Sequence, residues 1–97
     1  MDKYILSQKS HEDIDDIYNF GVHKFGQDQA LDYLMGLRTH FLFLLKNPQI
    51  GKRRDEIKKG LFSFSYVSHI VFYRVFDDYI RIVRVLHGSR DYKNCLR

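Results

Sequence analysis

The sequence has little cysteine and proline, and it lacks tryptophan and any long hydrophobic run. Of its 97 residues, one is cysteine and one is proline. The lone Cys95 excludes an internal disulfide, and no Cys/His cluster has zinc-ligand spacing, so we expect no metal site and no cofactor. The longest apolar run, Phe41–Leu45, is far shorter than the ~20 residues of a bilayer span, and no basic segment followed by an apolar stretch opens the chain. We therefore expect a cytoplasmic protein that does not enter a membrane.

Length and composition predict one folded domain over residues 1–97. Hydrophobic residues make up 44% of the chain and aromatic residues 15%. This gives enough apolar surface to offset the entropy that the chain loses on folding. A chain of this length is too short for a two-domain enzyme with a large buried cleft.

Charge is distributed unevenly along the chain. Residues 1–48 carry seven acidic and five basic side chains, whereas residues 49–97 carry eleven basic and five acidic ones. The second half therefore has a clear positive excess, which favours an acidic partner such as nucleic acid, an acidic segment of another protein, or both in turn.

The N-terminal half predicts a strand followed by a helical hairpin. Residues 4–7 form a short β-prone run, and Ser10 is suited to cap a helix that ends at Gly26. A second helix is expected from Gln27 or Asp28 to the residue before Asn47-Pro48, because proline disfavours helical geometry in the residue that precedes it. Gly36 either allows a close backbone approach or is a tolerated surface glycine. The apolar stripe of this helix is predicted at Leu31, Leu34, Arg38, Phe41, Leu42 and Leu45, widened by Leu37 and Leu44.

The C-terminal half predicts antiparallel strands. Residues 48–60 are polar and strongly basic, which is typical of a connector, and residues 61–66 then alternate with a period of two. Residues 68–76 and 79–87 are rich in β-branched and aromatic side chains, and Asp77-Asp78 joins them as a hairpin. A short tail follows from Gly88. The predicted fold class is α+β, with the N-terminal strand and the helical hairpin packed on a small antiparallel sheet.

No set of side chains predicts covalent catalysis. The four carboxylates of Glu12, Asp13, Asp15 and Asp16 are explained by the first turns of a helix, where they complement the helix dipole on a solvated face. The chain has no nucleophile elbow, no phosphate-binding glycine loop and no dinucleotide fingerprint. We therefore predict no catalytic residue.

The last predicted hairpin places arginine on a face that is otherwise apolar. Arg81 and Arg84 have opposite parity in the strand, so at least one of them must lie among buried side chains. One interpretation is a salt bridge to Asp77, Asp78, Asp91 or a helix carboxylate, or a β-bulge that turns the side chain outward. The other is a cationic groove that binds phosphates or carboxylates through Arg74, Arg81, Arg84, His87 and Arg90. Tyr66, Tyr73 and Tyr79 are candidates for base stacking or for half-buried sheet positions.

Several segments together carry a resemblance to a known family. They are Asn47-Pro48-Gln49-Ile50-Gly51, residues 55–60, Phe64 with residues 68–75, and residues 84–91. In this order and at this length, they resemble the ParE branch of the RelE/ParE toxin superfamily over nearly the whole chain. The resemblance implies the toxin of a type II toxin-antitoxin system and a cognate ParD-like antitoxin in a hetero-oligomer. It implies growth arrest through DNA gyrase, whose DNA-cleaving subunit is held in its cleaved complex with DNA. It also implies that operator DNA is bound only through the antitoxin.

The resemblance leaves two alternatives. The RelE branch consists of ribosome-dependent messenger RNA endonucleases that use a strand arginine, and the corresponding position here is Ile70, which cannot stabilise charge on a scissile phosphate. His87 and Tyr92 are the residues that still favour the nuclease alternative. The second alternative is a plain basic nucleic-acid-binding module, whose affinity falls steeply with salt.

Two candidate surfaces follow from the resemblance and the charge pattern. The target-binding surface is expected at Arg84, His87, Arg90 and Asp91, where the C-terminal family motif lies. The antitoxin-binding surface is expected at Arg53, Arg54, Arg74 and Arg81, which would meet acidic residues of an amphipathic or extended antitoxin segment.

Overall fold

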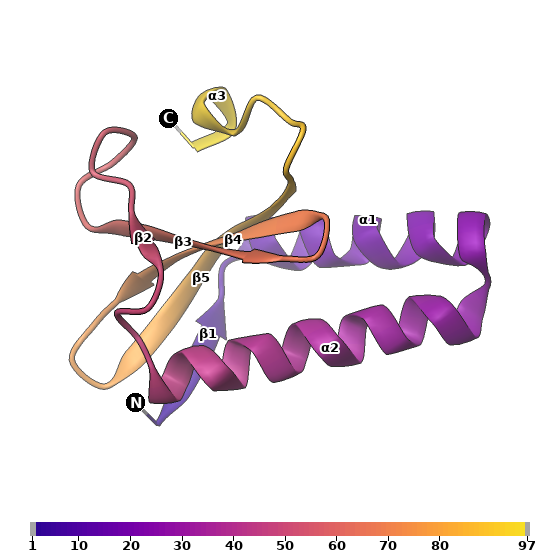
Figure 1. Cartoon of the computed structure of the whole chain (residues 1–97), viewed down its shortest axis with the longest axis horizontal. Coiled ribbons are helices and arrows are strands. Elements are labelled where there is room, and N and C mark those ends of the chain that lie inside the picture. Colours follow the sequence, from indigo (N-terminus) through magenta and orange to yellow (C-terminus); the bar gives the residue numbers. More distant parts are fainter. Residues whose placement is uncertain (1, 97) are drawn as a thin grey trace.

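The computed structural model describes residues 2–96 as a single sheet with helices on both of its faces (Figure 1). The sheet order is β1-β5-β4-β3-β2, and α1 and α2 cover one face while α3 lies on the other. The elements in chain order are β1 (Lys3–Leu6), α1 (Gln8–Phe25), α2 (Gln27–Lys46), β2 (Lys52–Arg53), β3 (Leu61–Tyr66), β4 (His69–Val75), β5 (Tyr79–His87) and α3 (Tyr92–Leu96).

The predicted α+β class is confirmed, but the sheet is mixed. Strands β2 to β5 pair antiparallel, whereas β1 pairs parallel with β5, from Lys3 opposite Tyr79 to Leu6 opposite Ile82. The helical hairpin between β1 and the rest of the sheet allows this parallel contact, since parallel strands need a long crossover. The predicted connector contains β2 and the predicted tail contains α3, and neither element was expected from the sequence.

The helix boundaries are largely as predicted. Gly26 ends α1 with φ 94°, in the positive-φ region that favours glycine, and α2 begins at the next residue. The predicted cap at Ser10 is wrong, because α1 begins before that residue. Ser7 is the N-cap, and its Oγ accepts the backbone N–H of Ser10 at 3.0 Å.

The buried stripe of α2 is rotated relative to the predicted one. Ala30, Leu37, Phe41 and Leu44 are buried, whereas Leu31 and Leu42 are 42% and 44% exposed. Gly36 does mark a close approach, but by the Tyr66 side chain: a Cβ at this position would collide with the Tyr66 hydroxyl. It is therefore not a surface glycine.

Hydrophobic clusters occupy both faces of the sheet. The cluster under α1 and α2 includes Leu37, Phe41, Leu44, Phe62, Val71, Tyr73, Ile80, Ile82 and Val85. The cluster under α3 consists of Leu61, Phe72, Leu86 and Leu96. The central hairpin is therefore covered by α1 and α2 on one face and shielded by α3 on the other. Among residues 2–96, no helix combines the length and the apolar character needed to cross a bilayer.

Candidate functional site

A β-bulge in β5 organises the end of the sheet where the candidate site lies. Pairing between β4 and β5 is regular from Val75 opposite Ile80 to Tyr73 opposite Ile82. The next pair is Phe72 with Arg84, so Val83 is the extra residue. From there to the end of the hairpin the register is shifted by one residue, and His69 lies directly opposite His87.

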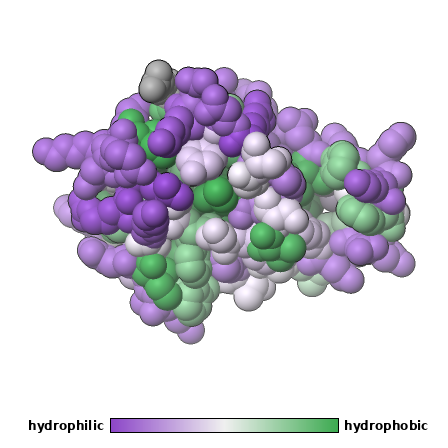
Figure 2. Space-filling model, turned by 45° about the horizontal axis from the view of Figure 1, so that its top comes forward, coloured by the Kyte–Doolittle hydropathy of each residue, from purple (hydrophilic) through white to green (hydrophobic). Residues whose placement is uncertain are grey.

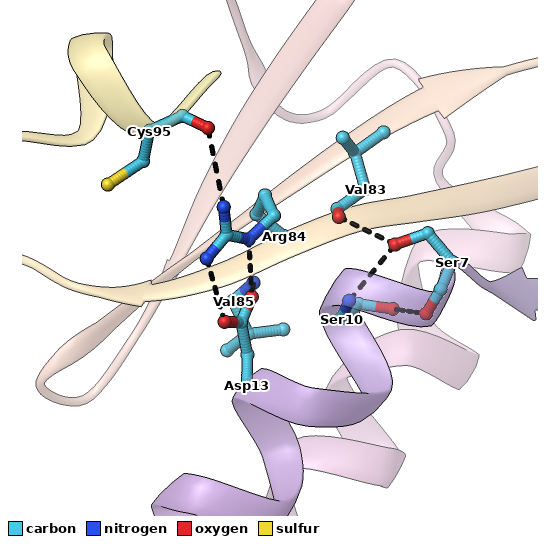
Figure 3. Close-up of polar contacts among 7 residues, drawn as sticks. All are labelled: Ser7, Ser10, Asp13, Val83, Arg84, Val85 and Cys95. Carbon is cyan, nitrogen blue, oxygen red and sulfur yellow. Dashed lines mark hydrogen bonds and ion pairs between the residues drawn. The ribbon is translucent and has the colours of Figure 1, made fainter. Parts of the chain in front are cut away.

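The start of α1 completes the edge of β5 beyond the end of β1. The Ser7 backbone N–H donates to the carbonyl of Ile82 at 3.0 Å, and its hydroxyl donates to the carbonyl of Val83 at 2.7 Å. The Asp13 carboxylate then accepts the backbone N–H of Val85 at 3.0 Å (Figure 3). The edge groups that β1 leaves unpaired are thus satisfied by a helix N-terminus.

Arg84 forms a buried ion pair with Asp13 across the same edge. Arg84 Nε and Nη2 donate to the two carboxylate oxygens at 2.8 and 2.9 Å, and Nη1 donates to the carbonyl of Cys95 in α3 at 3.3 Å (Figure 3). The bonds with Asp13 raise the pKa of Arg84 above its ordinary value. The salt-bridge interpretation therefore holds for Arg84, through a helix carboxylate. A bulge is present at Val83, but it does not turn Arg84 outward, since this side chain is 12% exposed. The expectation of a solvated Asp13 is wrong.

A groove lies between α1 and the paired ends of β4 and β5. Its first part, about 300 Å³, is lined by residues that include Asp16, Phe20, His69, His87 and Arg90. Its second part, about 450 Å³, shares Phe20, His69 and His87 and continues toward the tip of the helical hairpin. We call this the histidine groove.

Hydrogen bonds fix both imidazoles at the base of the histidine groove. The Tyr33 hydroxyl bonds His69 Nδ1 at 2.6 Å, and the backbone N–H of Ser89 donates to His87 Nδ1 at 3.1 Å. The neutral His87 ring therefore carries its proton on Nε2. The ring centroids of His69 and His87 are 5.4 Å apart. Burial, and then the proximity of His87, lowers the pKa of His69 below its ordinary value, and burial raises the pKa of Tyr33.

The tip of the helical hairpin carries exposed aromatic rings beside the groove. Phe20 and Phe25 are 62% and 55% exposed, and Lys24 Nζ lies 5.4 and 5.8 Å from their ring centroids. Apolar side chains stand among polar ones at this end of the molecule in the space-filling view (Figure 2). The groove therefore opens toward a partly apolar surface.

The structure brings together two of the four predicted target-binding residues. His87 and Arg90 both line the histidine groove. Arg84 does not line the groove; its side chain is 12% exposed and its charge is neutralised by Asp13. Asp91 accepts a hydrogen bond from the Asn94 side chain at 2.6 Å at the beginning of α3.

The four predicted antitoxin-binding arginines do not share one surface. Arg53 lies 5.3 Å from the ring centroid of Phe62, which belongs to the cluster under α1 and α2. Arg54 points to the opposite face, where it bonds Ser63 Oγ at 2.8 Å and lies 5.6 Å from the ring centroid of Tyr92 in α3. Arg54 directly follows β2, and its N–H still bonds the carbonyl of Leu61 at 2.7 Å. Successive residues of an extended backbone point to opposite faces, which explains the separation.

Arg74 and Arg81 form a cross-strand pair of like charge. They are direct register partners in β4 and β5. Among the ion pairs within residues 2–96, none involves either guanidinium. Like charges directly opposite each other destabilise a sheet, so this pair favours an anionic partner.

The predicted stacking tyrosines are mostly committed to the fold. Tyr73 is fully buried, donates to the carbonyl of Pro48 and accepts the N–H of Gly51, both at 3.0 Å. The Tyr66 hydroxyl donates to the carbonyl of Tyr33 at 3.0 Å. Tyr79 stacks on Phe76 with ring centroids 4.8 Å apart. Base stacking by Tyr73 is therefore contradicted.

Three contributors to the site were not predicted from the sequence. Tyr33 and Phe20 belong to no motif, and His69 appeared only within a family segment. Their assembly depends on the helix hairpin and on the shifted strand register, which no local pattern indicates. Within residues 2–96, no three or more His, Cys, Asp or Glu side chains are arranged to hold a metal ion.

Comparison with known proteins agrees with this architecture. The family described as "ParE toxin of type II toxin-antitoxin system, parDE" matches residues 4–92. Toxin ParE1 of Caulobacter vibrioides is 34% identical over 89 residues, and Toxin ParE1 of Mycobacterium tuberculosis is 37% identical over 90 residues; each alignment covers 92% of both chains. A solved structure titled "Chromosomal ParDE TA system from P. aeruginosa" superposes with a TM-score of 0.77 at 21% identity, covering 90% of this chain and 96% of that one.

These matches define a class of small toxins encoded in toxin-antitoxin modules. The chain belongs to the ParE toxin family of type II toxin-antitoxin systems.

Proposed function

We propose that this protein arrests growth in the cytoplasm by holding DNA gyrase in its cleaved complex with DNA, and that a ParD-like antitoxin neutralises it. The observation that carries the proposal is the family match over residues 4–92. The proposal makes the protein a topoisomerase poison and not an enzyme. A poison needs only to bind one conformational state of its target more tightly than the others.

The target-binding surface in this proposal is the mouth of the histidine groove. His87 and Arg90 line it, and Asp91 follows at the beginning of α3. A cation and imidazole N–H groups beside apolar walls suit a protein surface with acidic or carbonyl groups. Arg84 contributes as a positioning residue, because its bonds to Asp13 and to the Cys95 carbonyl tie α3 to β5 and α1.

The antitoxin-binding surface in this proposal is centred on the unpaired Arg74 and Arg81. An acidic antitoxin segment laid across this part of the sheet would relieve the repulsion between them. Arg54 points to the same face as Arg74, whose register partner Leu61 belongs to the cluster under α3. Arg53 points to the opposite face and is therefore left out of this surface. Association in such complexes is steered by charge, so it depends on salt.

The decisive assay measures linear DNA trapped on purified gyrase in the presence of ATP. We expect the wild-type chain to increase it, and the double variant His87→Ala/Arg90→Ala to remove the effect while remaining folded. His23→Ala, at an exposed position of α1, is the control. A ribosome-programmed messenger cleavage assay runs in parallel. Cut messenger without trapped DNA would refute gyrase poisoning and assign the chain to the nuclease branch.

The antitoxin surface is tested by association kinetics with the antitoxin encoded beside this chain. Arg81→Glu should lower the association rate about tenfold and flatten its salt dependence. Lys9→Glu makes the same charge change at an exposed position of α1 and should have little effect. Equal association rates for the two variants would remove Arg81 from the interface.

A further inference from the structure

The turn between β3 and β4 holds Val67 in a backbone conformation that valine rarely adopts. Its φ is 51°, and within residues 2–96 it is the only residue other than glycine with a positive φ. Val67 and Ser68 form the two-residue loop between the register partners Tyr66 and His69. The first residue of such a loop has a positive φ in both common hairpin turns, which favours glycine, asparagine or aspartate there. A β-branched residue at this position destabilises the fold.

The surroundings of the turn keep Val67 in this conformation. The N–H of Gly88 donates to the carbonyl of Ser68 at 2.9 Å, which connects the turn to the end of β5. On the other side, the Tyr66 hydroxyl donates to the carbonyl of Tyr33 at 3.0 Å, which connects it to α2. Val67 itself is 77% exposed, so its side chain adds nothing to the core. Packing within the fold therefore does not explain why a valine occupies the strained position.

Val67 lines the second part of the histidine groove, which we call the tip pocket. Its volume is about 450 Å³, which is within the range of sites that bind ligands or side chains. Phe20 and Phe25 of α1 provide further apolar walls. Gly21 and Ala30 also line the pocket, where the two helices lie so close that a Cβ on Gly21 would be 3.2 Å from the Ala30 Cβ. Because these two residues are small, no large side chain fills the space beside them.

The charges around the tip pocket restrict its occupant. Of the described residues that line it, Lys24 is the only Lys, Arg, Asp or Glu. None of the ion pairs within residues 2–96 involves Lys24, whose Nζ lies near the rings of Phe20 and Phe25. A single cation beside apolar walls suits a protein segment in which a large apolar side chain is next to a carboxylate. A nucleic acid would instead require a series of cations along its phosphates.

We propose that the tip pocket binds a large apolar side chain of the target protein, that Lys24 pairs with a carboxylate beside it, and that Val67 is a contact residue retained at a cost in stability. The identity of that target as gyrase rests on the function proposed above. The tip pocket shares His87 with the part of the groove that Arg90 lines. It therefore extends the proposed target-binding surface and not the proposed antitoxin-binding surface.

The first test measures the thermal stability of two variants of the purified full chain. Asparagine tolerates a positive φ, so Val67→Asn should raise the melting temperature by about 4 °C or more. Val67→Ile keeps a β-branched side chain and should leave the melting temperature nearly unchanged. An unchanged melting temperature for Val67→Asn would show that the turn is not strained and would overturn the proposed cost in stability.

The second test measures affinity for gyrase on cleaved DNA, and growth arrest when the chain is expressed without its antitoxin. Val67→Asn should lower the affinity about tenfold and weaken growth arrest, whereas Val67→Ile should retain both. Lys24→Gln should lower the affinity about threefold, because it removes the charge and keeps a long side chain. Ile50→Asn is the matched control, since Ile50 is β-branched, 48% exposed and outside the groove. A gain in stability together with a loss of binding is a result that a purely structural role of Val67 would not give.

Three outcomes would overturn the proposal. Val67→Asn that binds gyrase and arrests growth like the wild type would exclude the tip pocket from the target-binding surface. Weaker antitoxin binding with unchanged growth arrest would assign the pocket to the antitoxin. Salt-dependent binding of a single-stranded oligonucleotide that Val67→Asn abolishes would assign it to nucleic acid.

Failure of the proposed function can be told apart from failure of this inference. A wild-type chain that arrests growth without trapping DNA on gyrase would refute gyrase as the target. In that case, loss of growth arrest in Val67→Asn would support the tip pocket as the contact with another target protein, and retained growth arrest would overturn it.

Discussion

The Asp13–Arg84 ion pair permits a quantitative prediction about stability. Asp13 accepts three hydrogen bonds, two from Arg84 and one from the N–H of Val85. The side chains of Asp13 and Arg84 are 8% and 12% exposed, so removal of either partner leaves a nearly buried charge without compensation. Removal of one partner from a buried ion pair costs ~3–5 kcal/mol. Because both side chains keep some exposure, we expect Asp13→Ala and Arg84→Ala each to lower the free energy of unfolding by about 3 kcal/mol.

The double variant distinguishes a coupled pair from two independent contributions. Asp13→Ala/Arg84→Ala leaves neither charge buried, so it should cost little more than one single variant, with a coupling energy of about 2 kcal/mol. Equilibrium urea unfolding followed by far-UV circular dichroism measures all four proteins at neutral pH. If the two single effects add in the double variant, or if each is under about 0.5 kcal/mol, the ion pair does not fasten α1 to β5 as the structure implies.

Three further predictions concern packing, pH and charge. Gly36→Ala should lower the melting temperature, because the new Cβ meets the Tyr66 hydroxyl. This would outweigh the preference for alanine over glycine in a helix, which is about 1 kcal/mol. In a Tyr66→Phe background, the decrease in melting temperature should be smaller. The pKa of His69 is lower in the folded chain than in the unfolded chain, so unfolding takes up a proton in mild acid and stability falls as the pH drops below about 6.5. His69→Gln should reduce that loss between neutral pH and about pH 5.5, and equal losses would refute it. Arg81→Glu should raise the free energy of unfolding by about 0.5 kcal/mol, because it converts repulsion with Arg74 into attraction; an unchanged value would mean that solvent screens the pair.

Much of the fold could be predicted from local patterns. Gly26 and Asn47-Pro48 each follow a stretch with helical periodicity, and these residue types are typical of helix ends. Asp77-Asp78 separates two strongly β-prone runs and therefore predicts a turn. Phe76 N–H donates to the carbonyl of Tyr79 at 2.9 Å, so these two aspartates are the turn residues as expected. The two edge strands of the sheet were harder to predict. Strand β2 has two residues and β1 has four, and strands this short depend on pairing with their neighbours more than on intrinsic β propensity.

The candidate site was harder to predict because it depends on a register shift. A regular hairpin about Asp77-Asp78 pairs His69 with Leu86, and the pair of histidines exists only because Val83 is bulged. Asp13 was equally hard to single out, since its neighbours Glu12, Asp15 and Asp16 suggest a solvated helix start. Only the tertiary position of α1 against the free part of β5 shows that one of these carboxylates is buried.

The contacts that close the fold join residues far apart in the chain, and this has a consequence for synthesis. Ser7 bonds Val83 over a separation of 76 residues, and Asp13 bonds Arg84 over 71. Contacts this distant make folding slow, because a large loop must close before they form. A nascent chain that stops short of β5 has neither the histidine groove nor the partner strand for β1. Such a fragment exposes the helical hairpin to proteases and lacks the proposed target-binding surface, so we expect a truncated translation product to be harmless to the cell that makes it.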